Sequence, residues 1–251
     1  MRKYITTFLF SLLVLLSYAQ DSNSILNVYY QSFTRSYEED VKPDQSTMIL
    51  QMKGQQSVFF HQTDTVEFMG TTQYITYAEA ITKNYPLQGM VSQKNQIYPL
   101  HCYYEEPLPQ LDWDLQEGDT MICDYPCKKA VTTFRGRTWT AWYTEELPYD
   151  NGPWKLGGLP GLILKAVDKK GDFSYTAFRI RTSHGALHEY STKGYKKVDV
   201  KQFIKYLIRS AAEHDDFVEE FRGSRLNVSI DGVKYVSPVR TACLMECFND
   251  K

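Results

Sequence analysis

The chain has 251 residues, enough for one large domain, and with 43% hydrophobic and 23% charged residues it can bury a core. This composition excludes a collagen-like chain, a coiled coil and an intrinsically disordered segment. Lysine and arginine number 28 against 30 aspartate and glutamate residues, so the chain lacks the basic excess of nucleic-acid-binding proteins, and we expect no nucleic-acid partner. The aromatic content of 14% is typical of strands rather than helices.

The first 19 residues have the layout of a secretory signal peptide. A basic pair follows Met1, an apolar run covers 5–16, and small residues precede a cleavage site between Ala19 and Gln20. The apolar run is too short for a membrane helix, which needs about 20 residues. We therefore predict a signal peptide over 1–19, a single mature domain over 20–251 without a membrane span, and a periplasmic or secreted location.

Short runs rich in β-branched and aromatic residues, bounded by turn residues, predict strands along most of the mature chain. In chain order, the expected strands cover 25–33, 47–52, 57–61, 96–104, 120–124, 130–134, 138–144, 162–168, 173–182, 227–230 and 233–236. A short helix is expected over 77–84. The pair Asp231-Gly232 predicts a tight hairpin between the last two strands.

The region 200–222 predicts a long amphipathic helix. Asp199 can cap its start, Gly223 follows its end, and apolar residues recur every three to four positions. A helix of this kind usually lies on a sheet. We therefore predict an α+β fold, mainly of antiparallel β-structure, in which a curved sheet or half-barrel packs on one long amphipathic C-terminal helix.

The cysteines all follow the predicted cleavage site, where an oxidising compartment permits disulfides. The disulfide candidates are Cys102, Cys123, Cys127, Cys243 and Cys247. Five is an odd number, so one thiol is left over, and the sequence alone does not choose among the pairings. A turn between Cys123 and Cys127 favours a bridge between them, with Cys102 as the alternative partner of Cys127. The spacing does not fit a zinc site, and we expect no metal and no cofactor.

The stretch from Cys127 to Asp168 carries a series of short motifs. They are Ala141-Trp142-Tyr143-Thr144, Leu147-Pro148, Gly152-Pro153-Trp154 and Gly158-Leu159-Pro160-Gly161-Leu162-Ile163. In this order they resemble the GLPGLI family of exported proteins from the Bacteroidetes. The resemblance implies a secreted or periplasmic protein. Because that family has no established biochemical function, the resemblance implies no reaction.

The glycines and prolines of the last motif predict a bent loop that enters the strand over 162–168. Gly158 and Gly161 permit backbone angles that other residues avoid, and Pro160 fixes its own φ. The loop is either a structural corner that directs Trp154 into the core or the lining of a binding mouth. The candidate ligand or motif-loop residues are Trp142, Pro153, Trp154, Gly157, Gly158, Leu159, Pro160, Gly161, Leu162 and Ile163.

The sequence contains none of the common catalytic motifs, such as G-x-S-x-G, H-E-x-x-H or a P-loop, and we name no catalytic residue. Strand alternation places Trp142 on the opposite face from Trp139 and Tyr143, where we expect an apolar concavity. These features favour a non-catalytic periplasmic binding or accessory protein for an apolar or peptide-like ligand or an outer-membrane envelope protein. The alternative is a hydrolase whose residues form no recognisable motif.

Overall fold

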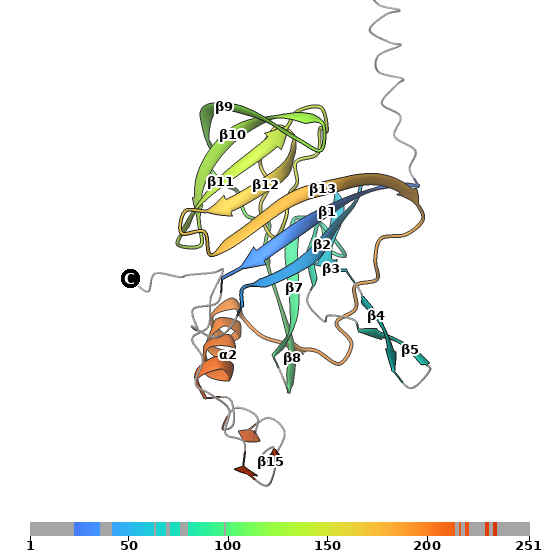
Figure 1. Ribbon diagram of the computed structural model, residues 1–251, viewed down its shortest axis with the longest axis vertical. Helices are drawn as coiled ribbons and strands as arrows, with labels where there is room; N and C mark the ends of the chain where they lie inside the picture. The colour runs from blue at the N-terminus through green and yellow to red at the C-terminus, as the bar shows by residue number, and fades with distance from the viewer. Residues whose placement is uncertain are drawn as a thin grey trace, which may run out of the picture.

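The computed structural model in Figure 1 describes residues 23–35, 42–62, 64–68, 71–75, 80–97, 99–213, 216, 219–220, 229–230 and 233–234. Its main element is a sheet of twelve strands within this part of the chain. These strands are β1 (Ser24–Thr34), β2 (Asp44–Lys53), β3 (Gln56–His61), β6 (Ala80–Lys83), β7 (Met90–Ile97), β8 (Leu100–Pro107), β9 (Asp114–Ile122), β10 (Tyr125–Phe134), β11 (Arg137–Thr144), β12 (Leu162–Asp168), β13 (Phe173–His184) and β14 (Lys196–Lys197).

Across the sheet the strands follow the order β14-β8-β7-β6-β3-β2-β1-β13-β12-β11-β10-β9. Neighbouring strands are antiparallel except β14 and β8, which are parallel. Two hairpins lie outside this sheet, β4 (Asp64–Phe68) with β5 (Thr71–Ile75) and β15 (Ser229–Ile230) with β16 (Val233–Lys234). The predicted tight hairpin near the end of the chain is therefore confirmed at Ser229–Lys234.

The alternation of buried and accessible side chains explains why these segments form strands. In β11, Trp139, Ala141 and Tyr143 are buried on the inner face, while Thr140 and Trp142 are only partly buried on the other. This is the pattern of a pleated strand with one face on the core. The predicted separation of Trp142 from Trp139 and Tyr143 is confirmed.

Several assignments differ from the expectation. The strand expected over 120–124 is the end of β9, which stops at Ile122. The helix expected over 77–84 is wrong, because Ala80–Lys83 forms β6 and pairs with both β3 and β7. The single strand expected over 96–104 is two strands, β7 and β8, which pair with each other. In these last two places the pairing with neighbouring strands outweighs the local residue preference, which is a weak guide in short segments.

The predicted α+β class, with a long helix under the sheet, is also wrong. The fold is mostly β, and helix α2 (Val200–Ala212) has 13 residues, capped by Asp199 and ending at Glu213. Its main contacts among the described elements are with β7 and β8, where Phe203 and Tyr206 join a small apolar cluster. The polar run 213–216 interrupts the apolar repeat on which the longer helix was predicted. The expected apolar positions at 217, 218 and 221 lie outside the described residues.

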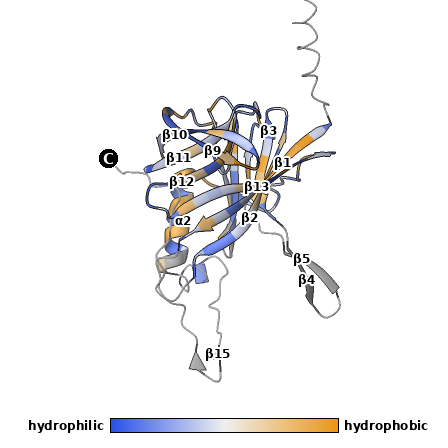
Figure 2. Cartoon of the chain, turned by 45° about the horizontal axis from the view of Figure 1, so that its top comes forward, coloured by the Kyte–Doolittle hydropathy of each residue, from blue (hydrophilic) through white to orange (hydrophobic). Residues whose placement is uncertain are grey.

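The connection between β11 and β12, residues 145–161, fills the place under the sheet that the helix was expected to take. Trp154, Leu156 and Leu159 of this connection are buried in the main core. The Trp154 ring lies 5.5 Å from the Trp139 ring and 5.3 Å from the Phe134 ring, measured between centroids. Apolar residues are concentrated on β1 and β3 in the middle of the sheet (Figure 2). The sheet therefore closes its core with one of its own connections.

A buried ion cluster joins β11 to the turn between β12 and β13. The Arg137 guanidinium donates to Asp168 Oδ2 at 2.8 Å and to Asp172 Oδ2 at 2.9 Å. Asp168 also accepts a hydrogen bond from the backbone N–H of Phe173 at 2.9 Å. Both carboxylates are almost fully buried, so their charges need compensation, which Arg137 gives to both and the half-exposed Arg35 gives to Asp172 at 3.6 Å.

Arg137→Ala is expected to lower the free energy of unfolding by about 3–5 kcal/mol, because it takes the cation away from buried Asp168 and leaves buried Asp172 with only the longer ion pair to Arg35. Urea denaturation of the variant and the parent measures this difference. The matched control is Lys169→Ala, an exposed cation of the same hairpin, which should change the stability by less than about 0.5 kcal/mol. Equal losses in both variants would contradict the role given to the cluster.

The predicted signal peptide, residues 1–19, lies outside the described residues, so its cleavage and the export of the chain stay predictions. The extent of the single mature domain over 20–251 also stays a prediction. In the part of the chain that the structure describes, no helix has the length and apolar character needed to cross a membrane.

Candidate functional site

The turns at one end of the sheet enclose a cleft. It consists of two adjoining hollows of about 780 Å³ and about 570 Å³ that share Gln55, Asn84, Gly89, Leu108, Asp150 and Asn151. We call it the amide cleft. Its full lining is Gly54, Gln55, Lys83, Asn84, Gln88, Gly89, Pro107, Leu108, Pro109, Gln110, Leu111, Leu147, Pro148, Tyr149, Asp150, Asn151, Lys155, Leu156, Gly157 and Gly158.

Strand pairing brings these distant segments together. Lys83 at the end of β6 pairs with Ser57 at the start of β3, and Met90 at the start of β7 pairs with Pro107 at the end of β8. The β2–β3 turn, the β6–β7 turn and the segment after β8 therefore share one end of the sheet. The connection 145–161 faces them across the cleft.

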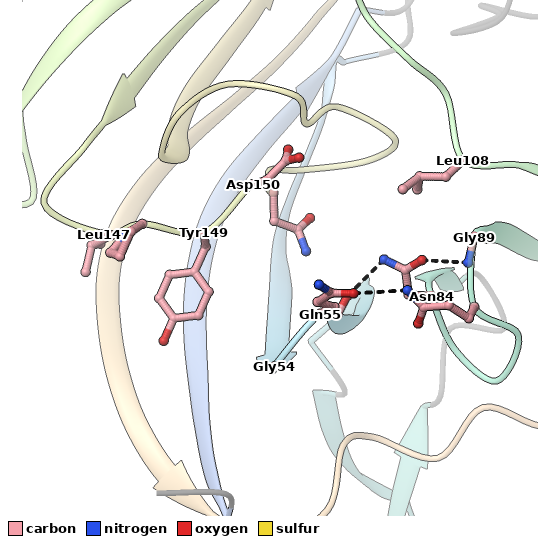
Figure 3. A pocket seen from close by; sticks show the side chains of 11 residues that line it. Gly54, Gln55, Asn84, Gly89, Leu108, Leu147, Tyr149 and Asp150 are labelled. Carbon is pink, nitrogen blue, oxygen red and sulfur yellow. Dashed lines mark hydrogen bonds between the residues drawn. The ribbon is translucent and has the colours of Figure 1, made fainter. Parts of the chain in front are cut away.

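One wall of the cleft is a network of carboxamides (Figure 3). Gln88 Nε2 donates to Gln55 Oε1 at 3.0 Å, and Asn84 Nδ2 donates to the backbone oxygen of Gln55 at 3.2 Å. Asn84 Oδ1 accepts from the backbone N–H of Gly89 at 2.8 Å. These bonds join the β2–β3 turn to the β6–β7 turn and fix the positions of the side-chain amides.

The other wall is built by the connection 145–161. Figure 3 shows Tyr149 and Asp150 across the cleft from Gln55 and Asn84. Asp150 Oδ1 accepts a hydrogen bond from the backbone N–H of Gly158. The indole N–H of Trp113 donates to the backbone oxygen of Gly157 at 2.7 Å. The backbone of Gly157 and Gly158 in this wall is therefore held by the side chains of Trp113 and Asp150.

Lys83 ties the two walls together beneath the cleft. Its buried Nζ donates to Asn151 Oδ1 at 2.9 Å, to the Gly152 oxygen at 3.0 Å and to the Leu156 oxygen at 2.5 Å. Three acceptors match the three N–H donors of an ammonium group, and Asp150 also favours the charged form. Burial has the larger effect and lowers the pKa of Lys83 to about 7.

A second buried lysine anchors the middle of the same connection. Lys155 Nζ donates to Glu106 Oε1 at 2.6 Å and to the Tyr104 hydroxyl oxygen at 2.5 Å, both on β8. Glu106 is also ion-paired with Arg135 of the β10–β11 turn. The connection 145–161 is thus bonded to β6 through Lys83 and to β8 through Lys155.

The two motif glycines at 158 and 161 are needed for different reasons. Gly158 has a φ of +86°, in the left-handed region that favours glycine, as the sequence predicts. Gly161 lies outside that region, so the predicted reason is wrong for it. A Cβ at position 161 would lie 2.1 Å from the backbone oxygen of Thr144, which shows that the constraint is the close approach of two backbones.

Gly161→Ala is expected to lower the free energy of unfolding by at least about 3 kcal/mol, because the added Cβ collides with backbone atoms that no rotamer change can move. The matched control is Gly54→Ala. Gly54 has a φ of +59° with nothing within 4 Å of an added Cβ, so strain alone should cost about 1 kcal/mol. Thermal or urea unfolding of both variants separates the two effects, and equal losses would contradict the steric argument.

Stability is expected to rise with pH between about 7 and about 10 because of Lys83. Its pKa in the folded protein is about 7, below its ordinary value of 10.5, so the unfolded chain binds more protons between these values. Urea denaturation across this pH range measures the rise. Lys83→Met should remove it, and Lys169→Met, which changes an exposed lysine, should retain it. Parallel pH profiles for the parent and Lys83→Met would refute this assignment.

The structure separates the predicted motif-loop residues into three groups. Gly157 and Gly158 line the amide cleft. Seven others act within or against the core: Pro153, Trp154, Leu159, Gly161, Leu162 and Ile163 are buried, while Pro160 is exposed beside them. Trp142 lies on the opposite face of the sheet, under the Lys165 ammonium at 4.8 Å from the ring centroid. Trp142 does not line the amide cleft, and the apolar concavity expected on its face of the sheet stays a prediction.

Cys102, Cys123 and Cys127 are free thiols in the structure, so the Cys123–Cys127 bridge and the Cys102–Cys127 alternative are not formed in it. Cys127 is buried in the core, and its thiol donates to the backbone oxygen of Tyr125 at 3.4 Å. Burial raises the pKa of Cys127 to about 11. Such a thiol is a poor nucleophile at neutral pH. Cys243 and Cys247 lie outside the described residues.

Most residues of the amide cleft were missed by the sequence reading. Gln55, Asn84, Gln88 and Gln110 belong to turns or loops, where polar residues are expected for local reasons. The signal that could have found them is the strand order, since alternate turns of an antiparallel sheet meet at one end. That order depends on long-range pairing such as β3 with β6, which the sequence does not display.

The cleft offers hydrogen bonds rather than strong acids or bases. Its lining combines carboxamides with the Tyr149 phenol and the apolar side chains of Leu108 and Leu111. Among the described residues that line it, Asp150 is the one carboxylate. Across the same part of the chain, no three His, Cys, Asp or Glu side chains gather closely enough to hold a metal ion. The arrangement is suited to binding a neutral polar ligand.

Comparisons with known proteins give one family and one fold. The family model described as N-glycanase peptide, N-terminal domain, matches residues 31–204. Two structures of PNGF-II, in space groups P21 and C2, match with TM-scores of 0.51 and 0.50 at 19% identity, and each covers 75% of this chain. The chain spans about a third of PNGF-II, 34% and 33% of its length in the two structures. A search of the curated proteins finds no match.

The predicted resemblance to the GLPGLI family is wrong. The matched family model covers residues 31–204, which includes the whole stretch from Cys127 to Asp168 on which the resemblance was based. The motif at 158–163 serves the local purpose described above, a tight approach to Thr144 and entry into β12. Short glycine-proline motifs with such a steric role are weak evidence for a family.

Proposed function

Because the chain belongs to the family of N-glycanase N-terminal domains, we propose that it binds N-linked glycans and that the amide cleft is the binding site. In this proposal the domain is non-catalytic. It recognises the carbohydrate and presents it for N-glycanase-related chemistry. The observation that carries the proposal is the concentration of carboxamide side chains in one cleft of this domain.

Carboxamides suit carbohydrate because they both donate and accept. Each has two N–H donors and an oxygen with two lone pairs, which matches the adjacent hydroxyl groups of a sugar ring. Gln88 uses one donor on Gln55 and Asn84 uses one donor and its oxygen on the turn backbone. The remaining donors and acceptors of these side chains are available for a ligand. Tyr149 and Leu108 supply the less polar surface that the C–H face of a sugar needs.

The cleft chemistry supports binding over catalysis. General acid–base hydrolysis uses groups whose pKa values match their roles, and glycoside hydrolysis commonly uses a pair of carboxylates. Asp150 is the single lining carboxylate among the described residues, and the Gly158 N–H already donates to it. Lys83 has a pKa near 7, but its Nζ is committed to three acceptors of the loop.

The polar lining also changes the ligand expected from the sequence. An apolar ligand would leave fixed amides such as Gln55 and Gln88 without hydrogen-bonding partners, at a cost of about 1–3 kcal/mol for each buried group. A peptide could satisfy them, and it is therefore the competing ligand in the test. A secreted or periplasmic location, which stays a prediction, would bring the domain to glycoproteins outside the cytoplasm.

The proposal predicts that the protein binds a free N-glycan and an N-glycopeptide but not the same peptide without its glycan. Isothermal titration calorimetry with these three ligands measures it. The double substitution of Gln88 and Gln110 by alanine should weaken glycan binding at least about tenfold, because each lost hydrogen bond contributes about 1 kcal/mol. The matched control is Gln116→Ala, an exposed carboxamide of β9 away from the cleft.

Three results would contradict the proposal. Equal affinity for glycosylated and unglycosylated peptide would show that the cleft recognises polypeptide. Unchanged glycan affinity in the double variant would place the binding elsewhere. Release of the glycan from the glycopeptide by the parent protein alone, followed by mass spectrometry, would exclude the non-catalytic role.

A further inference from the structure

The outer face of the sheet carries an ordered set of cations and aromatic rings. By the outer face we mean the face of β1 and β10–β13 that points away from the main core. Lys165 lies over the Trp142 ring at 4.8 Å, and Arg179 lies over Tyr29 and Phe178 at 5.0 Å and 5.4 Å. Each cation is a cross-strand neighbour of its ring, Lys165 of Trp142 and Arg179 of Tyr29.

These cations have no carboxylate partner among the described residues. Lys129, Lys165 and Arg179 belong to β10, β12 and β13, and the carboxylates of β12 and the following turn, Asp168 and Asp172, are buried in the inner ion cluster. The rings hold the cations in place, and with cations above them they do not offer open faces for stacking. Phe178 is 46% exposed, so the face also presents apolar surface.

The edge of the same sheet has the opposite charge. β9 is the outermost strand after β10, and its residues are exposed over almost its whole length. It carries Asp114, Glu117 and Asp119, and its Leu115 and Met121 are 61% and 63% exposed. Among the described strands, β9 has a neighbour on one side only, β10. An exposed edge of this kind favours association with another chain.

Charge segregation on one continuous surface favours a particular partner. A membrane or polyanion that binds the cations would meet the acidic residues of β9 beside them, and like charges would repel. A second copy of this chain has both charges in the complementary arrangement. We therefore propose that the outer face and the β9 edge form a twofold interface between two copies of this chain, in which the acidic residues of β9 lie against the cations of β12.

The strand register is compatible with this symmetry. Gln116, Lys129, Trp142 and Lys165 form one row across β9, β10, β11 and β12. In the proposed dimer the outer faces of the two copies lie against each other. A twofold axis between the two faces, parallel to the strands and midway between β10 and β11, places β9 of each copy opposite β12 of the other at the level of this row. Strand spacing makes β9 and β12 about 14 Å apart within one copy. Asp114 and Asp119 lie on either side of Gln116 along β9, and they therefore flank Lys165 of the second copy.

Sedimentation velocity over a range of protein concentrations tests the interface. The parent should form a dimer whose dissociation constant rises with salt, because its ion pairs are screened. Lys165→Glu should raise that constant at least about tenfold by placing like charges together. Lys201→Glu, the same charge reversal on exposed α2, should leave it unchanged. Asp119→Lys should weaken the dimer as Lys165→Glu does.

The decisive arm mixes the two variants. In a heterodimer of Lys165→Glu with Asp119→Lys, one contact keeps the original pair and the other has the pair reversed, so dimerisation should return to near the parent value. A misfolded variant could not be rescued in this way. A parent that stays monomeric at every concentration, a dimer indifferent to Lys165→Glu, or variants that do not rescue each other would overturn the proposal. If the parent is monomeric and floats with phosphatidylglycerol vesicles, the outer face is a membrane-binding surface and the dimer proposal is wrong.

This proposal is independent of the glycan-binding proposal. Lys165 and Asp119 lie outside the amide cleft, so Lys165→Glu should bind the N-glycan as the parent does. A failure of dimerisation therefore leaves glycan binding to be judged by its own titration.

Discussion

The hydrogen bonds of the buried Lys83 ammonium to the connection 145–161 are the interaction on which the rest of the structure depends. An open, almost entirely antiparallel sheet of twelve strands has an apolar inner face that must be covered. Here the cover is a loop, and a loop inside a protein brings backbone carbonyls that need donors. Lys83 Nζ hydrogen-bonds to two of these carbonyls, those of Gly152 and Leu156, and to the side-chain oxygen of Asn151, and Lys155 bonds the same loop to β8. The loop, held by Lys83 of β6 and by its own Lys155, thus takes the place of a covering helix.

The amide cleft follows from this arrangement. The bonded loop holds Tyr149 and Asp150 across from the turns that carry Gln55 and Asn84. The hollow between them is therefore preformed. A preformed site binds its ligand with less loss of conformational entropy than a mobile one. The glycan-binding proposal therefore uses a feature that the fold already requires. The outer face, where cations lie over aromatic rings, is a separate surface.

The sequence predicted local features well and long-range features poorly. The strands β1, β3, β12 and β13 were predicted close to their observed bounds, because each has a clear apolar pattern between turn residues. The prediction of a helix at 77–84 was wrong because 80–83 pairs with two strands of the sheet. The prediction of a long helix after 200 was wrong because the polar run 213–216 interrupts its apolar repeat. In the cleft, only Gly157 and Gly158 were predicted. Gln55, Asn84 and Asp150 come together through the order of the strands, and Lys83 in a strand gives no sign of its three partners.

Nuclear magnetic resonance of the side-chain amides tests the central claim most directly. In the labelled protein titrated with a free N-glycan, the NH₂ signals of Gln55, Asn84 and Gln88 should shift together with the glycan concentration, while those of Gln116 on β9 should stay in place. The same titration with the unglycosylated peptide should move none of them. If the cleft amides do not respond to the glycan, or if the shifts gather on the outer face, the account of this cleft as a carbohydrate site is wrong.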